Sequence, residues 1–288
     1  MKNSIHTLKK LFAVCCILTS QFIHSTNTIA QSAGYFRNPL DIPIALSANF
    51  GEIRSNHFHT GFDIRTNAET GYKVYAAADG VISRIKVSAT GFGNVLYISH
   101  PNGYMTVYGH LDRFNDAIAA YVKQQQYAKQ SFEVELFPDA GKFPVKKSDL
   151  IAYSGNSGSS GGPHLHFEIR DASGETFPLN PAAFYALDDT IPPKFSALYL
   201  YGIDKTTGDP VKYSIKKNKS GYALVNDSVT INKPVIGVAV EAADYMNHAS
   251  NDYGIFEYRV KLDGQLIYSV KFDRFDFSNG RYVNAFTD

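Results

Sequence analysis

Two Asx-Gly dipeptides constrain the fold more than any other feature of the sequence. Asp79-Gly80 lies within YKVYAAADGVISRIKVSA, and Asn102-Gly103 lies within NVLYISHPNGYMTVYGHL, between two alternating runs. Such a pair supplies the positive φ angles of a two-residue hairpin turn, and alternation of apolar and polar residues is the pattern of a half-buried strand. The sequence therefore predicts an all-β, mainly antiparallel fold built of hairpins. The 19 Tyr and 20 Phe favour the same class.

Length and changes of pattern predict two domains in the 288 residues. We expect a lead-in segment over 31–49, a hairpin-built β domain over 50–186 and a linker over 187–196. A β-sandwich-like, Ig-like domain follows over 197–288, where Asp263-Gly264 marks another hairpin. The sequence leaves open whether this second domain is truncated.

One segment of the first domain, residues 114–143, departs from the strand pattern. FNDAIAAYVKQQQYAKQ has no alternation and is rich in Ala, Gln and Lys, so we expect a short helical or mobile insertion there. This insertion is placed to wall or cover a substrate groove.

Residues 1–30 have the pattern of a signal peptide. Three lysines precede an apolar run over 11–23, and small residues at 28–30 offer a cleavage site near Ala30. The run is shorter than the roughly 20 residues of a membrane span. We therefore expect a mature chain without a transmembrane span, exported to the periplasm, the cell envelope or the medium. Cys15 and Cys16 lie within this segment, so the mature chain has no thiolate ligand, and lipidation is a minority alternative.

Charge excludes one class of partner. The chain has 28 Lys+Arg and 27 Asp+Glu, so it lacks the basic field that nucleic-acid-binding proteins use.

Two sequence segments bring together groups that bind metals. In HLHFEIR, His164 and His166 share one strand face and Leu165 takes the other. In HTGFD, His59 and Asp63 would lie about 13 Å apart on a straight strand, so we expect Gly61 to bend the backbone and bring them together.

These residues make a three-ligand set of His59, Asp63 and one histidine of HLH, which suits zinc (Zn2+) with an open position for water. The residues alone do not decide between His164 and His166. The histidine left over and His110, of VYGHL, are then unligated imidazoles suited to acid–base catalysis near neutral pH.

Five further side chains also carry expectations from the sequence. Glu168 shares the strand face of His166, where it either orients a ligand or faces solvent. We expect His57 and His100 to be polar loop residues. The Gly-Ser run over 154–163 predicts a flexible loop that leaves room for an extended peptide. A bulky residue at Ser159 or Ser160 should therefore obstruct such a peptide.

HTGFD, YGHL and SGNSGSSGGPHLHFEI, in this order, resemble the three motifs of the lysostaphin and LytM-like family of zinc metallopeptidases, which cut peptide bonds in bacterial peptidoglycan. The resemblance extends over residues 50–186, including FGEIR and AAADGVISRI, and does not cover the second domain. It implies that His59, Asp63 and His166 hold the zinc, and that His110 and His164 are the unligated pair beside the water. Some relatives place an oxyanion-stabilising Tyr six residues before the first ligand, and this chain has Ile53 there.

The motifs thus predict an exported zinc metalloendopeptidase that hydrolyses peptide cross-links of peptidoglycan, using zinc-activated water and histidine acid–base assistance. Its expected partners are peptidoglycan stem peptides and cross-bridges, and a cell-envelope protein that binds the C-terminal domain. One alternative is a non-catalytic LytM-like activator of a cell-wall amidase, and another is a zinc-stabilised adhesion or scaffold protein. Retention of all five motif residues favours the enzyme.

Overall fold

The computed structural model describes residues 34–285 except 174–175, 203–209, 220, 227, 231, 233 and 248. The predicted signal peptide, residues 1–30, lies outside the described residues. Among the described helices, none combines the length and the apolar character that crossing a membrane requires.

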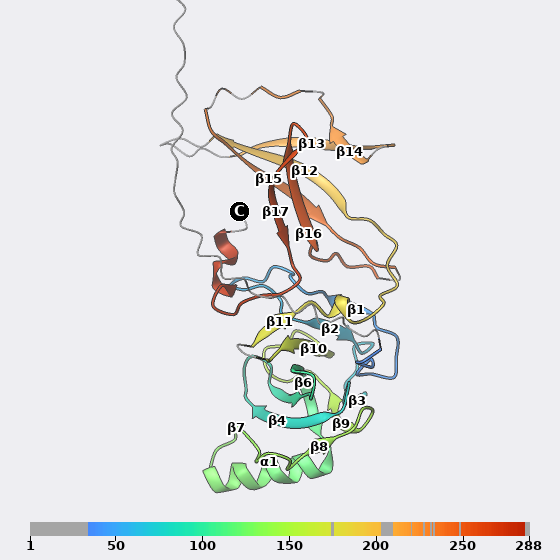
Figure 1. Ribbon diagram of the computed structural model, residues 1–288, viewed down its shortest axis with the longest axis vertical. Helices are drawn as coiled ribbons and strands as arrows, with labels where there is room; N and C mark the ends of the chain where they lie inside the picture. Colours follow the sequence, from blue (N-terminus) through green and yellow to red (C-terminus); the bar gives the residue numbers. More distant parts are fainter. Residues whose placement is uncertain are drawn as a thin grey trace, which may run out of the picture. The chain divides into compact units, whose positions relative to one another are not determined.

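An antiparallel sheet forms the part of the chain that contains the motifs (Figure 1). Its main path runs β1-β2-β10-β6-β5-β4-β7, and four further strands pair along it. Every pairing within it is antiparallel, which confirms the predicted fold class. The strands are β1 (Leu46–Ala48), β2 (Phe62–Arg65), β3 (Lys73–Tyr75), β4 (Gly80–Val87), β5 (Asn94–Ser99), β6 (Tyr104–Phe114), β7 (Val134–Leu136), β8 (Pro144–Val145), β9 (Leu150–Ser154), β10 (His164–Asp171) and β11 (Phe177–Leu179).

Two of the three predicted hairpins form. Asn102-Gly103 joins β5 to β6, and Asp263-Gly264, with φ angles of 49° and 82°, joins β16 (Glu257–Leu262) to β17 (Gln265–Lys271). The prediction for Asp79-Gly80 is wrong, because β3 pairs with β9 rather than with β4. Gly80 instead permits a close approach of strands, since a Cβ atom there would lie 2.5 Å from the carbonyl oxygen of Ser99.

The strand that carries both motif histidines, β10, is central and pairs with β2 and β6. Leu165, Phe167 and Ile169 are each 0% exposed, as the alternation predicts. Burial of such a side chain stabilises the fold by about 1.5–3 kcal/mol. The apolar face of β10 therefore holds the strand in place while its other face is free to carry polar groups.

The segment over 114–143 contains the predicted helix, α1 (Asp116–Lys129). The side chain of Asn115 accepts a hydrogen bond of 3.0 Å from the backbone N–H of Ile118, which caps the N-terminus. Ile118 and Val122 are buried, and α1 packs on β6 and β7.

The prediction that His100 is a solvated loop residue is wrong. Its side chain is 6% exposed, and Nδ1 donates a 2.8 Å hydrogen bond to the carbonyl oxygen of Asp79. Nε2 lies 2.8 Å from the hydroxyl of Thr106. The imidazole thus links the loop before β4 to β6, a tertiary contact that no local pattern indicates.

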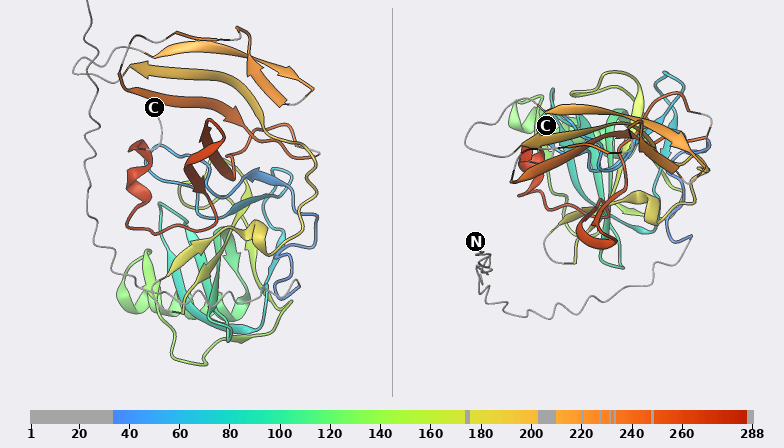
Figure 2. Two further views of the ribbon diagram at one scale, coloured as in Figure 1. Left: turned by 45° about the horizontal axis from the view of Figure 1, so that its top comes forward. Right: turned by 90° about the horizontal axis from the view of Figure 1, so that it is seen from above.

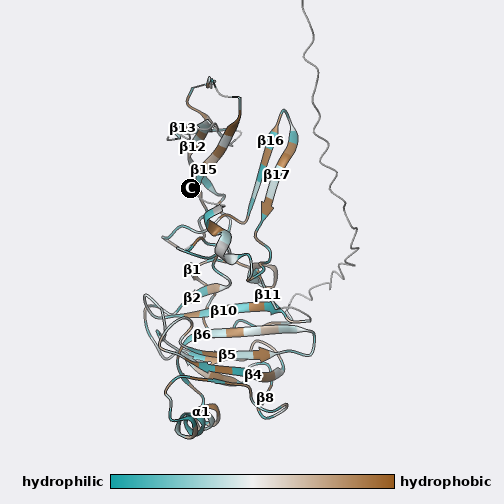
Figure 3. Cartoon of the chain, turned by 90° about the vertical axis from the view of Figure 1, so that its left-hand side faces the viewer, coloured by the Kyte–Doolittle hydropathy of each residue, from teal (hydrophilic) through white to brown (hydrophobic). Residues whose placement is uncertain are grey.

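The C-terminal part of the described chain forms two small sheets (Figure 2). One has the order β14-β13-β12-β15 and the other is the β16–β17 hairpin, along which Figure 3 shows hydrophobic residues. The β-sandwich stays a prediction. The remaining elements are β12 (Lys194–Gly202), β13 (Val211–Asn218), β14 (Gly221–Leu224), β15 (Ile236–Ala243) and the short 3-10 helices η1 (Pro181–Ala183) and η2 (Gly280–Ala285).

Residues on both sides of the predicted linker share one hydrophobic core. Met246, Tyr253 and Phe272 belong to the same buried cluster as Phe50 and Phe62. The domain boundary at 187–196 stays a prediction, but residues beyond it support the strands that carry the motifs.

Candidate metal centre

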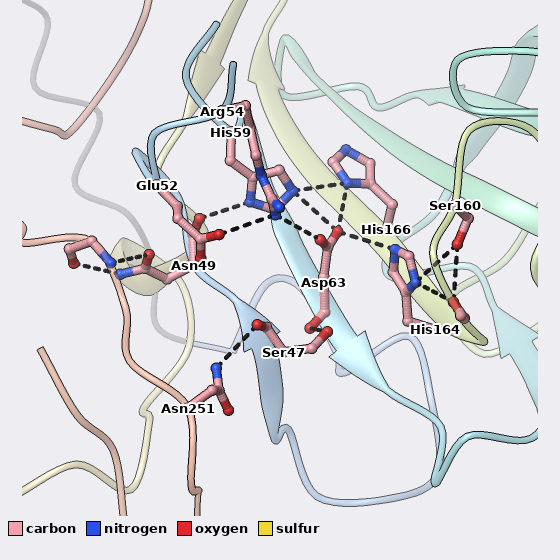
Figure 4. A network of polar contacts seen from close by, with 12 residues as sticks. Ser47, Asn49, Glu52, Arg54, His59, Asp63, Ser160, His164, His166 and Asn251 are labelled. Atoms are coloured by element: carbon pink, nitrogen blue, oxygen red, sulfur yellow. Dashed lines mark hydrogen bonds and ion pairs between the residues drawn. The ribbon is translucent and has the colours of Figure 1, made fainter. Parts of the chain in front are cut away.

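Three side chains predicted as ligands converge at the joined ends of β2 and β10 (Figure 4). His59 Nε2 lies 3.0 Å from Asp63 Oδ1 and 3.1 Å from His166 Nδ1, and His166 Nδ1 lies 2.9 Å from Asp63 Oδ1. All three residues are buried. His59 and Asp63 meet because the chain bends at Gly61 before β2 begins.

Gly61 is required here by close packing. A Cβ atom at this position would lie 2.4 Å from the carbonyl oxygen of Phe167 and 2.8 Å from the side chain of Glu168. A larger residue would push the backbone that links His59 and Asp63 away from β10.

The second nitrogen of each ligand histidine is held by an acceptor. His59 Nδ1 donates a 2.7 Å hydrogen bond to the carbonyl oxygen of Asn49, and His166 Nε2 donates a 2.9 Å bond to Glu168 Oε1. Because these oxygens can only accept, each imidazole carries a proton on that side and presents its other nitrogen to Asp63.

Three buried ligand atoms therefore face one another. Burial opposes protonation of His166, but its hydrogen bonds with Asp63 and Glu168 raise its pKa to about 9. Without a metal, His166 Nδ1 thus shares a proton with Asp63, and a bound cation would displace that proton. The donor set of two imidazoles and one carboxylate is the kind that binds zinc, and ligand atoms at about 2.0–2.2 Å from a tetrahedral ion lie about 3.3 Å apart. The observed separations of 2.9–3.1 Å fit this requirement.

The electrostatics of the centre also suit a cation. Burial opposes ionisation of Asp63, but hydrogen bonds from His164, His166 and His59 hold its pKa well below its usual value. Burial likewise opposes ionisation of Glu168, but the charges of Arg170 and His166 lower its pKa to about 2. Both carboxylates are thus ionised, Asp63 as one of the three donors and Glu168 behind a ligand histidine.

Glu168 therefore faces the interior, and the alternative of a solvent-facing strand residue is wrong. It is 0% exposed, and Oε1 also accepts a 2.6 Å hydrogen bond from the hydroxyl of Thr60. Oε2 accepts from Arg170. The carboxylate thus joins His166 to the loop that follows His59.

The predicted unligated pair, His110 and His164, lies beside the three donors. Their ring centroids are 4.8 Å apart, and His164 Nε2 lies 3.4 Å from Asp63 Oδ1. His110 Nδ1 donates a 2.8 Å bond to the carbonyl oxygen of Ser157, and His164 Nδ1 donates a 2.8 Å bond to that of Gly162. In both neutral rings Nε2 is consequently the unprotonated nitrogen.

These two carbonyls belong to the Gly-Ser run, which gives the run a defined role. Its backbone sets the tautomer of both unligated histidines. The run also packs closely, because a Cβ atom at Gly158 would lie 2.3 Å from the backbone nitrogen of Gly93. The prediction of an entirely flexible loop is therefore wrong for residues 157–159, where Ser159 N–H donates a 2.8 Å bond to the carbonyl oxygen of Gly91.

His110 has two unusual properties. Burial and the charge of His166 lower its pKa to about 4. Its φ of 57° is in the left-handed region, which is uncommon for a residue other than glycine and occurs often at functional sites. The sequence indicated the residue but not its backbone conformation.

A groove of about 600 Å³ opens over the centre. His57 and the Gly-Ser run line it, as do the five motif residues. The expectation that the 114–143 insertion walls the groove is wrong for the described lining residues, none of which comes from it.

Several groove residues were missed from the sequence. Phe92 stacks on His166 with ring centroids 4.5 Å apart, and Arg54 lies 3.3 Å from Asp63 Oδ2. Phe275, Asp276 and Phe277 come from near the end of the chain. Only Arg54 lies beside a motif, within FGEIR, and no local pattern distinguishes the others.

Part of the chain is similar in sequence to known peptidases. Residues 57–133 match the family model described as peptidase family M23. Over 160 residues, the chain is 31% identical to the DD-carboxypeptidase/endopeptidase Mpg of Neisseria meningitidis serogroup B, covering 54% of this chain and 30% of that protein. It is 30% identical over 155 residues to the peptidoglycan DD-endopeptidase ShyC of Vibrio cholerae, covering 51% of this chain and 29% of that one.

The chain thus spans under a third of the length of these relatives. Among solved structures, a mutant catalytic domain of the prophage-encoded M23 protein EnpA from Enterococcus faecalis is 22% identical, with a TM-score of 0.39. That match covers 53% of this chain and 100% of the other.

Proposed function

Because this chain carries a domain of peptidase family M23, we propose that it is an exported zinc metalloendopeptidase that hydrolyses peptide cross-links of bacterial peptidoglycan. The observation that carries the proposal is the convergence of three buried metal-ligating side chains, His59, Asp63 and His166, beside two further imidazoles. The relatives named for peptidoglycan DD-endopeptidase activity support the choice of substrate.

In this proposal, His59 Nε2, Asp63 Oδ1 and His166 Nδ1 hold the zinc. When bound, the ion lowers the pKa of water toward about 7 and polarises the scissile carbonyl. The chain's own residues then perform the proton transfers and hold the substrate.

His110 and His164 are proposed to move the proton. Their Nε2 atoms are unprotonated in the neutral rings, since Nδ1 donates to the Gly-Ser backbone. One of them accepts the proton of the attacking water, and the leaving amine receives a proton from the pair. Fixed tautomers keep the accepting nitrogen ready, so no ring rotation is needed before the reaction.

Arg54 is proposed to keep Asp63 ionised and oriented. Its guanidinium lies 3.3 Å from Asp63 Oδ2 and 3.3 Å from Glu52. Asp63 Oδ1 then remains directed at the two ligand histidines.

The proposed function is tested by release of soluble peptides from purified peptidoglycan, with zinc and with a chelator. Asp63→Asn keeps the shape of the side chain but removes the ligand charge, so we expect it to abolish release. Asp171→Asn, at the opposite end of β10, is the matched control and should retain release. Release that persists in the chelator or in Asp63→Asn would refute the proposal.

Export is a separate part of the proposal and rests on the pattern of residues 1–30. N-terminal sequencing of the protein recovered from the cell envelope or the medium tests it. We expect the mature chain to begin at Gln31, whereas a chain that retains residues 1–30 in the cytoplasm would refute it.

A further inference from the structure

A segment near the end of the described chain forms one wall of the groove. We name residues 272–280 the C-terminal strap. Phe275, Asp276, Phe277 and Gly280 of the strap line the groove together with Arg54 and the motif residues. The strap lies outside the segment that matches the peptidase family.

Backbone hydrogen bonds attach the strap to the sheet that carries the site. Arg274 forms an antiparallel bridge with Leu179 of β11, and Phe275 N–H donates a 3.0 Å bond to the carbonyl oxygen of Pro178. The side chain of Asn180 donates a 2.9 Å bond to the carbonyl oxygen of Phe272. Because β11 pairs with β10, the strap is held through one strand to the strand of His164 and His166.

Aromatic packing anchors the strap beside the first motif. The ring of Phe275 stacks on Phe58 at 5.1 Å and on Phe50 at 4.6 Å, with interplanar angles of 8° and 18°. Phe58 directly precedes His59. Phe272 is 4% exposed and lies against Gly51, where a Cβ atom would be 3.0 Å from it.

Two side chains of the strap beyond Phe275, those of Asp276 and Phe277, face the groove. Val283, in η2, is fully buried, whereas Phe277 is 48% exposed with Arg170 4.8 Å from its ring centroid. Asp276 is half-buried, and its Oδ1 accepts a 2.8 Å hydrogen bond from the N–H of Ser278. Asn279 N–H donates a 3.0 Å bond to the carbonyl oxygen of Asp276, which makes this a tight turn.

The carboxylate on this turn is available to a ligand in its charged form. Hydrogen bonds from Ser278, followed by the charge of Arg274, lower the pKa of Asp276. An anchored turn that carries an ionised carboxylate next to an exposed aromatic ring offers an apolar contact and a charge contact side by side.

Resting on the proposed peptidase function, we propose that the strap forms a substrate subsite for a long aliphatic side chain that ends in an ammonium group. The ring of Phe277 contacts the aliphatic part and the carboxylate of Asp276 binds the ammonium. The strap thereby selects the substrate, while the five motif residues hold the metal and transfer the protons.

The test measures binding of synthetic peptides to the zinc-loaded full chain. Two matched sets of peptides are used. In one set a single lysine occupies each position in turn, and in the other its uncharged isostere norleucine does. Affinities are measured by titration calorimetry. We expect the wild type to prefer lysine by about tenfold at one position, equivalent to about 1.4 kcal/mol. Asp276→Asn should abolish this preference, and Phe277→Ala should weaken both peptides equally.

Two controls keep the comparison matched. Asp273→Asn removes a carboxylate from the same strap but outside the groove lining, and Phe132→Ala removes an exposed ring far from it in sequence. Neither should change the affinities, and all variants should bind one zinc ion per chain.

Equal affinities for lysine and norleucine at every position, or a preference that survives in Asp276→Asn, would overturn the inference. A wild type that binds none of the peptides would also overturn it. Hydrolysis of peptidoglycan is measured in parallel. The expected binding pattern without hydrolysis supports the subsite and refutes only the proposed function, and hydrolysis without the pattern refutes only the subsite.

Discussion

Replacement of Glu168 by glutamine should weaken both the fold and the metal centre. The carboxylate has two sets of donors: His166 Nε2 and Thr60 at Oε1, and Arg170 at Oε2. Glutamine has only one acceptor oxygen, so its NH₂ group must face a donor on one side. The variant therefore leaves one donor without an acceptor, and in either orientation of the amide it removes the negative charge behind the ligand histidine.

The magnitude follows from the burial of these groups. Glu168 is 0% exposed and the side chain of Arg170 is 9% exposed, and removing one partner of a buried ion pair costs about 3–5 kcal/mol. At roughly 2–4 °C per kcal/mol for a chain of this size, Tm should fall by roughly 6–20 °C. Loss of the acceptor for His166 should reduce zinc affinity by about 10–100-fold.

Zinc affinity is measured by competition with a chromophoric chelator, and Tm by thermal unfolding of the metal-free protein. Glu135→Gln is the matched control, because Glu135 pairs with Arg84 at the surface and exposed pairs contribute about 0–1 kcal/mol. A Glu168→Gln protein with the zinc affinity of the wild type would refute the role of the carboxylate in orienting His166.

Three further predictions follow from other positions. Burial lowers the pKa of His100, so its stabilising contribution is present above the unfolded pKa of about 6.5 and is lost as the pH falls below it. His100→Gln should therefore flatten the decline in the free energy of unfolding between pH 7.5 and pH 5, measured by denaturant titration. Parallel pH profiles of the variant and the wild type would contradict this. Gly61→Ala would place a Cβ atom 2.4 Å from the Phe167 carbonyl oxygen and should lower the free energy of unfolding by about 1–3 kcal/mol. The control Gly161→Ala, whose Cβ atom would have no atom within 4 Å, should not lower it. Equal stabilities of the two variants would count against the packing argument. A phenylalanine at Ser159, whose hydroxyl accepts a 3.0 Å bond from the facing turn, should slow cleavage of cross-linked peptides, and unchanged turnover would argue against a narrow groove.

Features that depend on local geometry were predictable from the sequence. Alternation along 164–171 places Leu165 in the core, because successive strand side chains point to opposite faces. The bend at Gly61 followed from the distance that His59 and Asp63 must span. Asn102-Gly103 forms its hairpin for an equally local reason, since the two residues adopt the turn themselves.

Features that depend on tertiary contacts were not predictable. Asp79-Gly80 has the composition of a hairpin turn, but Gly80 instead allows the close approach of β5. His100 donates to the carbonyl oxygen of Asp79, 21 residues away, and packs against the ring of Phe36, 64 residues away. The C-terminal part of the chain contacts Asn49, whose carbonyl oxygen holds His59, across 205 residues, because the Asn49 side chain donates to the carbonyl oxygen of Gly254. No periodicity or motif encodes such a contact.

The choice between His164 and His166 also depends on tertiary contacts rather than on local geometry. Both lie on one face of β10, and the pattern alone cannot separate them. In the structure His166 Nδ1 is 2.9 Å from Asp63 Oδ1 and has Glu168 behind it, whereas His164 Nε2 is 3.4 Å away and has a backbone carbonyl behind it. The carboxylate supports the proposed ligand, and the carbonyl fixes the tautomer of the proposed base.

The most direct test of the central claim separates metal binding from catalysis at these two histidines. Zinc content and cleavage of a purified cross-linked peptide, followed by mass spectrometry, are measured for the wild type and for His164→Ala. We predict that both proteins bind one zinc ion per chain and that only the wild type cuts the peptide. Cleavage by His164→Ala at the wild-type rate would contradict the proposed catalytic pair, and zinc binding without cleavage by the wild type would favour the non-catalytic activator.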